Sequence, residues 1–452
     1  MRAQNRFVLP FVLPVASFAA AIFIGSLLLW SPLAQAGKPV AYIDALFIAT
    51  SSVCVTGLST VDIYTTFSTF GHVVMLFLIQ LGGISITACT TLILYLVSHR
   101  ISLTDRLAVG NALLNDPSFN LGKFLKRVLI YILTLELCAA AILCLFEPER
   151  ISAFSAIFLT VSAFCNAGFA LWSDNLMSWQ QNALVTTVVM TMIVLGGIGF
   201  AVLDESLYQI TTRLRRQRAA PWSLQTKLVW RTTIFLIVAG AALLMLFEYF
   251  ANDSDPSTLP ELVLPSFFQS VTARTAGFNT VTIGSLTDIS LLVLILLMLI
   301  GGSPGSCAGG IKTTSFRVLL SFISAQLRGR SQVVVDGKAV DTATLNKTFL
   351  LLIFTFLAIG LATFALALTE GGANPHGKTP FQVLDLLFEA VSAFATVGLT
   401  TTVSPNLSDA GKLIDCALMY MGRLGPIWLI TTIQQLQTEP RYRLPERSLS
   451  IG

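Results

Sequence analysis

Four short segments of the chain carry the same pair of residues at the same spacing. Each has a phenylalanine ten residues before a glycine, and a leucine or phenylalanine directly after it. The glycines are Gly57, Gly168, Gly277 and Gly398, at intervals of 111, 109 and 121 residues. Glycine adopts backbone conformations that other residues avoid, and carbonyl oxygens replace the hydration shell of a cation. The repeat therefore predicts one cation site built from four backbone segments.

The predicted ion ligands are the three residues that end at each glycine. They are Val55, Thr56, Gly57, Asn166, Ala167, Gly168, Thr275, Ala276, Gly277, Thr396, Val397 and Gly398. A short helix before each glycine directs the negative end of its dipole at the ion. The third copy has one residue fewer between its valine and its glycine than the second and fourth copies, so its local geometry is expected to differ.

A glycine-rich stretch interrupts a long apolar segment after the third copy. It contains Gly301, Gly302, Ser303, Pro304, Gly305, Gly309 and Gly310. Proline removes a backbone donor, and each glycine costs a helix about 1 kcal/mol relative to alanine, so no straight helix is expected here. Non-helical backbone at membrane depth must line a cavity or lie within protein. The stretch is therefore either a flexible loop beside a cavity or a static kink that permits close packing.

Three cationic side chains belong to these apolar regions, where charges are costly and usually face the protein interior. Lys312 ends the glycine-rich stretch, and Arg423 lies in the last apolar segment. For Arg423 we predict a pore-facing role. The alternatives are that it holds the loop through backbone carbonyls or pairs with an acid such as Glu136 or Glu389. For Arg274, assigned to the third short helix, we predict a structural role, with neutralisation by an acid such as Glu389.

The composition indicates a membrane protein. Hydrophobic residues make up 54% of the 452 residues and charged residues only 12%, whereas soluble domains carry about 25% charged residues. Lysine and arginine cluster in a few segments, and the positive-inside rule places these and both termini in the cytoplasm. This arrangement requires an even number of crossings. The basic segments follow the membrane segments in their spacing, so they do not indicate nucleic-acid binding.

The expected architecture is an all-α membrane protein of four pseudo-symmetric helix–pore loop–helix repeats, with eight crossings around one pore. The predicted first helices cover about 7–30, 124–146, 230–250 and 349–369, and the second helices about 71–97, 182–209, 289–326 and 411–437. Shorter helices between them, such as 42–52 and 379–394, are too short to span a bilayer. The repeats are 1–99, 100–212, 213–327 with the loop at 301–314, and 328–438, followed by a tail at 439–452. The first segment resembles a signal peptide, but its apolar run is too long for one.

No enzyme chemistry is indicated. The sequence has no nucleophile triad and no paired-carboxylate site, and the glycine-rich stretch lacks the Gly-Lys-Ser/Thr ending of a nucleotide loop. The seven cysteines form no CxxC pair and predict neither a disulfide framework nor a metal site. No covalent cofactor is expected.

Across essentially the whole chain, these motifs resemble the Trk/Ktr/HKT superfamily of potassium transporters, and especially its KtrB-like members. The resemblance rests on Thr56-Gly57-Leu58 with Asp62, Asn166–Phe169, Thr272–Thr280, Gly301–Thr314 and Thr396–Leu399. The absence of extra N-terminal helices favours a KtrB-like over a TrkH-like protein.

The resemblance implies that the four filter glycines coordinate potassium, and glycine at all four positions favours potassium over sodium. It also implies that the loop, with Lys312 and Arg423, obstructs permeation until it is displaced. By the same resemblance we expect a homodimer in the bacterial inner membrane, working with a cytosolic KtrA-like nucleotide-binding ring, and sodium as an activator. The alternative is a TrkH-like or sodium- or proton-coupled secondary transporter, which usually has more ionisable residues along its path.

Overall fold

The structure is a computed structural model that describes residues 4–83, 121–218, 220–251, 259–371 and 380–425. It is almost entirely helical, so the predicted all-α class is confirmed. Its helices are α1 (Gln4–Trp30), α2 (Tyr42–Cys54), α3 (Ile63–Thr66), α4 (Thr69–Gly83), α7 (Leu121–Phe146), α8 (Ala153–Cys165), α9 (Ala183–Gly197), α10 (Phe200–Leu214), α11 (Leu224–Ala251), α12 (Leu259–Thr272), α13 (Asp288–Leu299), α14 (Thr313–Leu327), α15 (Thr342–Gly371), α16 (Val383–Ala395) and α17 (Asp409–Leu424).

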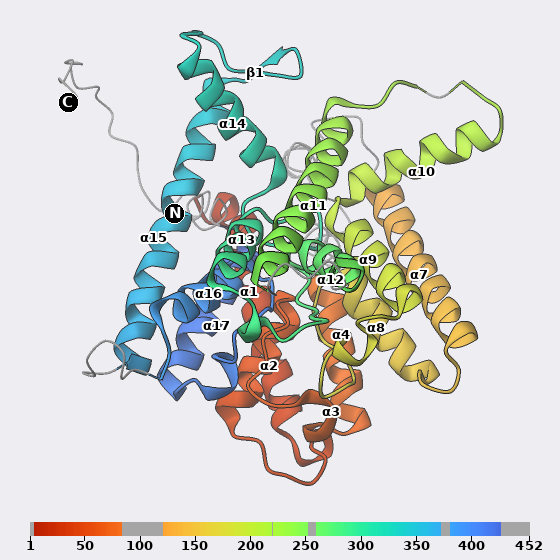
Figure 1. The fold of residues 1–452 in the computed structure, drawn as a ribbon, viewed down its shortest axis with the longest axis vertical. Helices are drawn as coiled ribbons and strands as arrows, with labels where there is room; N and C mark the ends of the chain where they lie inside the picture. The colour runs from red at the N-terminus through yellow and green to blue at the C-terminus, as the bar shows by residue number, and fades with distance from the viewer. Residues whose placement is uncertain (1–3, 84–120, 219, 252–258, 372–379, 426–452) are drawn as a thin grey trace.

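Short 3₁₀ helices and one hairpin complete the described residues. The 3₁₀ helices are η1 (Pro32–Ala34), η2 (Met177–Trp179), η4 (Ile283–Ser285) and η5 (Ser404–Asn406). Strands β1 (Val334–Val335) and β2 (Lys338–Ala339) pair antiparallel after α14. In Figure 1 the hairpin and α14 lie at the top of the molecule, while α2 and α3 lie at the bottom.

Three described helices are long and apolar enough to cross a membrane. They are Lys126–Phe146, Leu224–Ala251 and Thr342–Gly371. Shorter apolar helices flank them, including Thr69–Gly83 and Asp288–Leu299. The predicted second helices at 71–97 and 411–437 continue into residues outside the described part of the chain.

The predicted continuous helix at 182–209 is wrong. The structure has two helices there, α9 and α10, bent by 112° at the break; counted as one, they make a fourth candidate span. Gly199 lies at the break with a φ of +94°, and a Cβ placed there would approach the Pro304 carbonyl oxygen to 2.6 Å. The bend therefore makes room for the glycine-rich loop.

The third predicted long helix, 289–326, is interrupted as expected. Helix α13 ends at Leu299 and α14 begins at Thr313, while Ile300 and Ile311 form an isolated parallel bridge at the base of the loop. The loop thus leaves and re-enters the helical layer at nearly the same place.

The short helices pack between the long ones. Helix α2 contacts α1, α4 and α17, helix α8 contacts α7, α9 and α4, helix α12 contacts α11, and α16 contacts α15 and α17. Most of their residues are buried, including Phe47, Phe158 and Phe388, which are 0% exposed. The shared phenylalanine therefore anchors three of the four short helices in the core.

Candidate functional site

Helices α2, α8, α12 and α16 are followed by the same backbone pattern. One residue takes a left-handed conformation, and the glycine two positions later also has a positive φ. The left-handed residues are Val55, Asn166, Thr275 and Thr396. Left-handed backbone at a non-glycine residue costs of order 1–3 kcal/mol and persists only where the surroundings enforce it. The four segments therefore share one enforced geometry.

The four glycines form a closed ring. A Cβ added to Gly57 would lie 2.6 Å from the Ala167 carbonyl oxygen and 3.1 Å from the Gly168 Cα. A Cβ on Gly168 would meet the next segment in the same way, 2.8 Å from the Ala276 oxygen and 2.9 Å from the Gly277 Cα.

The ring continues through the remaining two segments to its starting point. A Cβ on Gly277 would overlap the Val397 oxygen, and one on Gly398 would overlap the Thr56 oxygen. Each glycine therefore faces the carbonyl of the residue that precedes its neighbouring glycine, and the four segments contact one another in a closed cycle. Only glycine fits this approach.

Serine side chains support three of the four segments from behind. Ser51 Oγ accepts a hydrogen bond from the Gly57 N–H, Ser392 Oγ accepts one from the Gly398 N–H, and Ser162 Oγ accepts one from the Phe169 N–H. The third segment has Val271 at this position, and Thr272 instead donates to the Phe278 carbonyl at 2.7 Å. The expected difference in the third copy is thus a change of supporting hydrogen bond, while the ring itself is kept.

We expect Ser392→Ala to lower the midpoint of thermal unfolding of the purified protein. The Gly398 N–H would lose its acceptor inside the protein, and an unsatisfied buried donor costs about 1–3 kcal/mol. Ser404→Ala also removes a buried hydroxyl, but one that supports Glu389 and not the Gly398 N–H. If Ser392→Ala changes the potassium-to-sodium flux ratio no more than Ser404→Ala does, the serine does not shape the ring.

Three hydroxyls at the ring are buried without a partner. Thr56, Thr275 and Thr396 are each 0% exposed, and their Oγ1 atoms have no hydrogen-bond partner among the described residues. An orphaned buried hydroxyl costs free energy unless something absent from the protein itself satisfies it. These oxygens are chemically suited to the same cation as the carbonyls.

The glycine-rich loop docks against the break between α9 and α10. The Ser303 N–H donates to the Gly197 carbonyl at 2.9 Å, the Cys307 N–H donates to the Gly196 carbonyl at 3.2 Å, and the Phe200 N–H donates to the Gly305 carbonyl at 3.0 Å. The Ser303 hydroxyl of the loop lies 3.0 Å from the Thr313 hydroxyl at the start of α14. The loop is therefore held by backbone hydrogen bonds to a different segment of the fold.

The loop also touches the ring. A Cβ on Gly309 would lie 2.7 Å from the Ala395 carbonyl oxygen and would overlap the Thr396 hydroxyl. The loop thus contacts the end of α16 directly, at the left-handed residue that precedes Gly398.

Arg423 bridges the loop to another helix. Its guanidinium donates to the Cys307 carbonyl and to the Gly82 carbonyl at the end of α4, and it is 8% exposed. No ion pair of Arg423 with Glu136 or Glu389 occurs among the described residues, so the alternative in which it holds the loop through carbonyls describes this structure.

Lys312 and Arg274 hold the same loop at its two ends. The Lys312 ammonium donates to the Ala308 carbonyl at 2.6 Å, and Arg274 donates to the Gly301 carbonyl at 3.4 Å. Arg274 lies just after α12, not within it, and it makes no ion pair with Glu389 in the described part of the chain. Both the placement of Arg274 in the helix and its neutralisation by an acid are therefore wrong.

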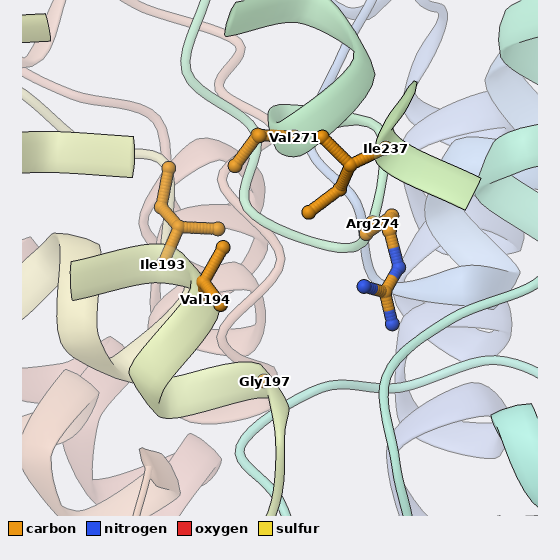
Figure 2. Close-up of a pocket in the computed structure, with 6 residues that line it drawn as sticks. All are labelled: Ile193, Val194, Gly197, Ile237, Val271 and Arg274. Atoms are coloured by element: carbon orange, nitrogen blue, oxygen red, sulfur yellow. The ribbon is translucent and has the colours of Figure 1, made fainter. Parts of the chain in front are cut away.

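Figure 2 shows a small pocket beside Arg274. It is lined by Ile193, Val194 and Gly197 of α9, Ile237 of α11, Val271 of α12, and Arg274. The pocket is apolar apart from Arg274, which lies across it from Ile193 and Val194 in this view. It separates the short helix α12 from the break between α9 and α10.

Asp62 joins the first two segments on the side of α3. Its carboxylate caps α3 through the Tyr64 N–H and accepts a hydrogen bond from Ser173 at 2.6 Å. Partial burial opposes ionisation, but the hydrogen bonds from Ser173, Thr65 and Tyr64 outweigh it and lower the pKa of Asp62. Asp62 therefore stays charged and ties the two loops together.

A second set of glycines was missed from the sequence. Gly82, Gly196 and Gly422 pack against the carbonyls of Val53, Phe164 and Phe394, which lie two residues before a left-handed residue. A Cβ at any of the three would overlap that carbonyl. The available signal was their spacing, because each follows its ring glycine by 24 to 28 residues.

Comparison with known proteins gives a full-length match. The family model "TrkH: Cation transport protein" matches residues 3–441. The chain is 36% identical to "Ktr system potassium uptake protein B" of Bacillus subtilis, over 99% of this chain and 97% of that protein. It is 31% identical to "Potassium/sodium uptake protein NtpJ" of Enterococcus hirae, over 97% of each.

A solved structure shares the fold. The potassium transporter TrkH from Vibrio parahaemolyticus superposes with a TM-score of 0.69 at 17% sequence identity, covering 95% of this chain and 84% of that one. At this identity the likeness concerns the fold alone.

Proposed function

The chain belongs to the TrkH family of cation transport proteins, and from this membership we propose that it takes up potassium across the cytoplasmic membrane of a bacterium. Members of this family are ion transporters and not enzymes. The relatives named for potassium uptake match over nearly the full length. The apolar helices supply the membrane-embedded part.

The four-glycine ring is the proposed selectivity filter. The observation that carries it is the convergence of the Thr56, Ala167, Ala276 and Val397 carbonyls on the neighbouring glycines. Carbonyl dipoles replace the water shell of a monovalent cation. The buried hydroxyls of Thr56, Thr275 and Thr396 add oxygens on the same path. Potassium is the substrate at these residues.

The proposed topology has eight crossings in four repeats with both termini in the cytoplasm. Helices α1, α7, α11 and α15 each precede one short helix, and α4, α9–α10, α13–α14 and α17 each follow one. Short helices that stop at membrane depth are tolerated where they are buried in protein or line a water-filled cavity, and a ring of carbonyls suits the second case.

The loop from Gly301 to Gly310 is the proposed gate. Its contact with Thr396 and Ala395 supports a position next to the filter. Arg423 and Lys312 hold it there through carbonyl oxygens, which are neutral partners. Displacing the loop gives up such hydrogen bonds, whose net value is about 1.5–3 kcal/mol for each charged donor.

Regulation by a second component is also proposed. The relatives are named as parts of a Ktr system, which supports a partner subunit. We expect a homodimer with a cytosolic KtrA-like nucleotide-binding ring, docking on the basic segments 213–231 and 328–347. Sodium is proposed as an activator.

Flux measurements test the proposal. Purified protein in liposomes is expected to carry potassium down its gradient, with sodium flux much lower and no obligatory proton movement. Flux of potassium that stops when a sodium or proton gradient is removed would identify the coupled alternative. Liposomes made with Gly168→Ala protein control for leak.

A further inference from the structure

Two buried carboxyl groups lie on adjacent helices beside the fourth filter segment. Glu389 lies on α16 and Asp415 on α17, and both are 0% exposed. Glu389 accepts hydrogen bonds from Thr400 at 2.7 Å and from Ser404. Neither carboxyl oxygen of Asp415 has a hydrogen-bond partner among the described residues. The carboxyl group of Glu389 therefore has hydrogen-bond donors within the described part of the chain, and that of Asp415 has none.

The same two positions are apolar in the other three segments. The residues nine before the other ring glycines are Ile48, Leu159 and Phe268, and each is 0% exposed. Asp415 lies seven residues after Ser408, the N-cap of α17. The residues at the start of the three corresponding helices are Ser68, Asn182 and Thr287. Seven positions after them stand Met75, Val189 and Leu294. All three are buried at 1% or less. The fold therefore does not need acids at these positions.

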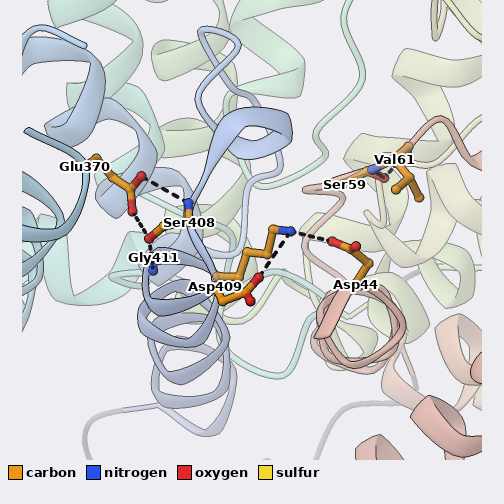
Figure 3. Close-up of polar contacts among 8 residues, drawn as sticks. Asp44, Ser59, Val61, Glu370, Ser408, Asp409 and Gly411 are labelled. Carbon is orange, nitrogen blue, oxygen red and sulfur yellow. Dashed lines mark hydrogen bonds and ion pairs between the residues drawn. The ribbon is translucent and has the colours of Figure 1, made fainter. Parts of the chain in front are cut away.

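Within the part of the chain that the structure describes, Asp415 has no counter-ion. Electrostatically it is affected by Glu389 and Glu370, both acidic. Helix α17 packs against α16, α15 and α2. The other ionisable groups on these helices are Asp385, Lys347, Asp44, Tyr42, Cys54, Asp409, Lys412, Cys416, Tyr420 and Arg423. The nearest lysine in sequence, Lys412, is held by Asp44 at 2.8 Å and by Asp409 at 3.8 Å (Figure 3), and Arg423 donates to carbonyls.

We propose that Asp415 is a proton-binding site, occupied as a neutral carboxylic acid in the conducting protein. An isolated carboxylate in a dry interior is so costly that it takes up a proton instead. A second carboxylate nearby strengthens this preference, because two like charges in one buried site do not both ionise readily. A bound metal ion would need several oxygen ligands, whereas the proton needs none.

The site has an outlet to the surface. Glu370, half-buried at the end of α15, accepts hydrogen bonds from the Ser408 N–H at 3.1 Å and from its hydroxyl at 2.6 Å (Figure 3). A Cβ on Gly411, one turn before Asp415, would lie 3.2 Å from the Glu370 carboxyl carbon. This half-buried acid is the proposed route by which Asp415 exchanges protons with the surface.

Deprotonation would act on the filter through Glu389. The Thr400 hydroxyl that donates to Glu389 also accepts from the Val403 N–H at 3.1 Å and the Ser404 N–H at 3.3 Å. The segment that contains Thr400, Val403 and Ser404 begins two residues after Gly398. A new negative charge on Asp415 repels Glu389 and disturbs the hydrogen bonds of Glu389 with Thr400 and Ser404. Potassium flux should therefore fall as the pH rises.

Two readouts on the full-length protein test the site. Infrared spectra of wild-type protein at neutral pH should contain a carboxylic-acid carbonyl band that Asp415→Asn and Asp415→Leu both lack. In liposomes, wild-type potassium flux should fall several-fold from mildly acidic to alkaline pH, whereas Asp415→Asn, a permanently neutral replacement, should keep the acidic-pH flux throughout. Asp415→Leu introduces the residue that α13 has at the corresponding position, Leu294. It is the second neutral variant and replaces Asp415→Asn if that variant does not fold.

The control is Asp409→Asn, an acid-to-amide change on the same helix at a side chain that is 79% exposed. It should retain the wild-type band and pH profile. The inference is overturned if Asp415→Asn keeps the band, or if its flux depends on pH as in the wild type. It is also overturned if sodium or lithium at constant pH removes the band, since a metal ion then occupies the site. The flux arm rests on the proposed transport function, whereas the infrared arm does not, so the two failures are distinguishable.

Discussion

Potassium flux should fall by about a hundredfold or more in Gly168→Ala, which corresponds to about 2.7 kcal/mol on the barrier. The added Cβ would lie 2.8 Å from the Ala276 oxygen and 2.9 Å from the Gly277 Cα, both backbone atoms. Relief requires one of two filter segments to move, and a displaced carbonyl no longer replaces the water that the ion gives up. Flux of radioactive rubidium or potassium into liposomes measures the effect.

Gly337→Ala is the matched control. Gly337 also has a positive φ, +81°, but a Cβ there would meet nothing within 4 Å. Both variants therefore carry the cost of a left-handed alanine, about 1–2 kcal/mol, and only Gly168→Ala adds the collision. Equal flux in the two variants would show that the ring does not form the conducting path.

Arg423→Gln should raise basal potassium flux, measured without any partner subunit, by about tenfold. The guanidinium bridges the Cys307 carbonyl of the loop to the Gly82 carbonyl of α4. A hydrogen bond from a charged donor contributes about 1.5–3 kcal/mol, and losing one such bond shifts the loop toward its displaced position by about tenfold for each 1.4 kcal/mol. The basal flux of Arg423→Lys should lie between those of the wild type and Arg423→Gln, because one ammonium group does not reproduce the planar fork of donors of a guanidinium.

Arg127→Gln provides the comparison for a lost arginine. Arg127 pairs with Asp204 at 3.4 Å, but its side chain is 52% exposed, and exposed pairs contribute only about 0–1 kcal/mol. It should leave basal flux unchanged. If Arg423→Gln lowers flux while the protein remains folded, the arginine supports conduction and does not restrain the loop.

The positions of the candidate site were largely predictable because the signal is local. Glycines that recur with a phenylalanine ten residues earlier mark a backbone conformation, and conformation at Gly57 or Gly398 depends mainly on the residue itself. The all-helical class followed from long apolar runs, since a bilayer admits few other structures. The interruption at Gly301–Gly310 followed from proline and glycine costs within a helix.

The partners of the charged groups were not predictable, because they come from distant parts of the chain. Arg423 binds carbonyls of residues 82 and 307, which no spacing rule connects to it. The bend between α9 and α10 was missed for the same reason: Gly199 is required by the Pro304 carbonyl, which arrives from another segment. Arg274 was predicted to be neutralised by an acid, whereas its guanidinium donates to the Gly301 carbonyl of the loop.

The sequence by itself determined that this chain enters a membrane as helices and that four glycine segments resemble one another, since hydropathy and backbone permissiveness are properties of single residues. The tertiary structure alone decided that those glycines close into a ring and that Arg274, Lys312 and Arg423 bind carbonyls of one loop. It also decided that Asp415 has no hydrogen-bond partner among the described residues. These are distances between residues far apart in sequence. The packing of the whole chain sets these distances, and the type of a residue does not determine which distant residue it contacts.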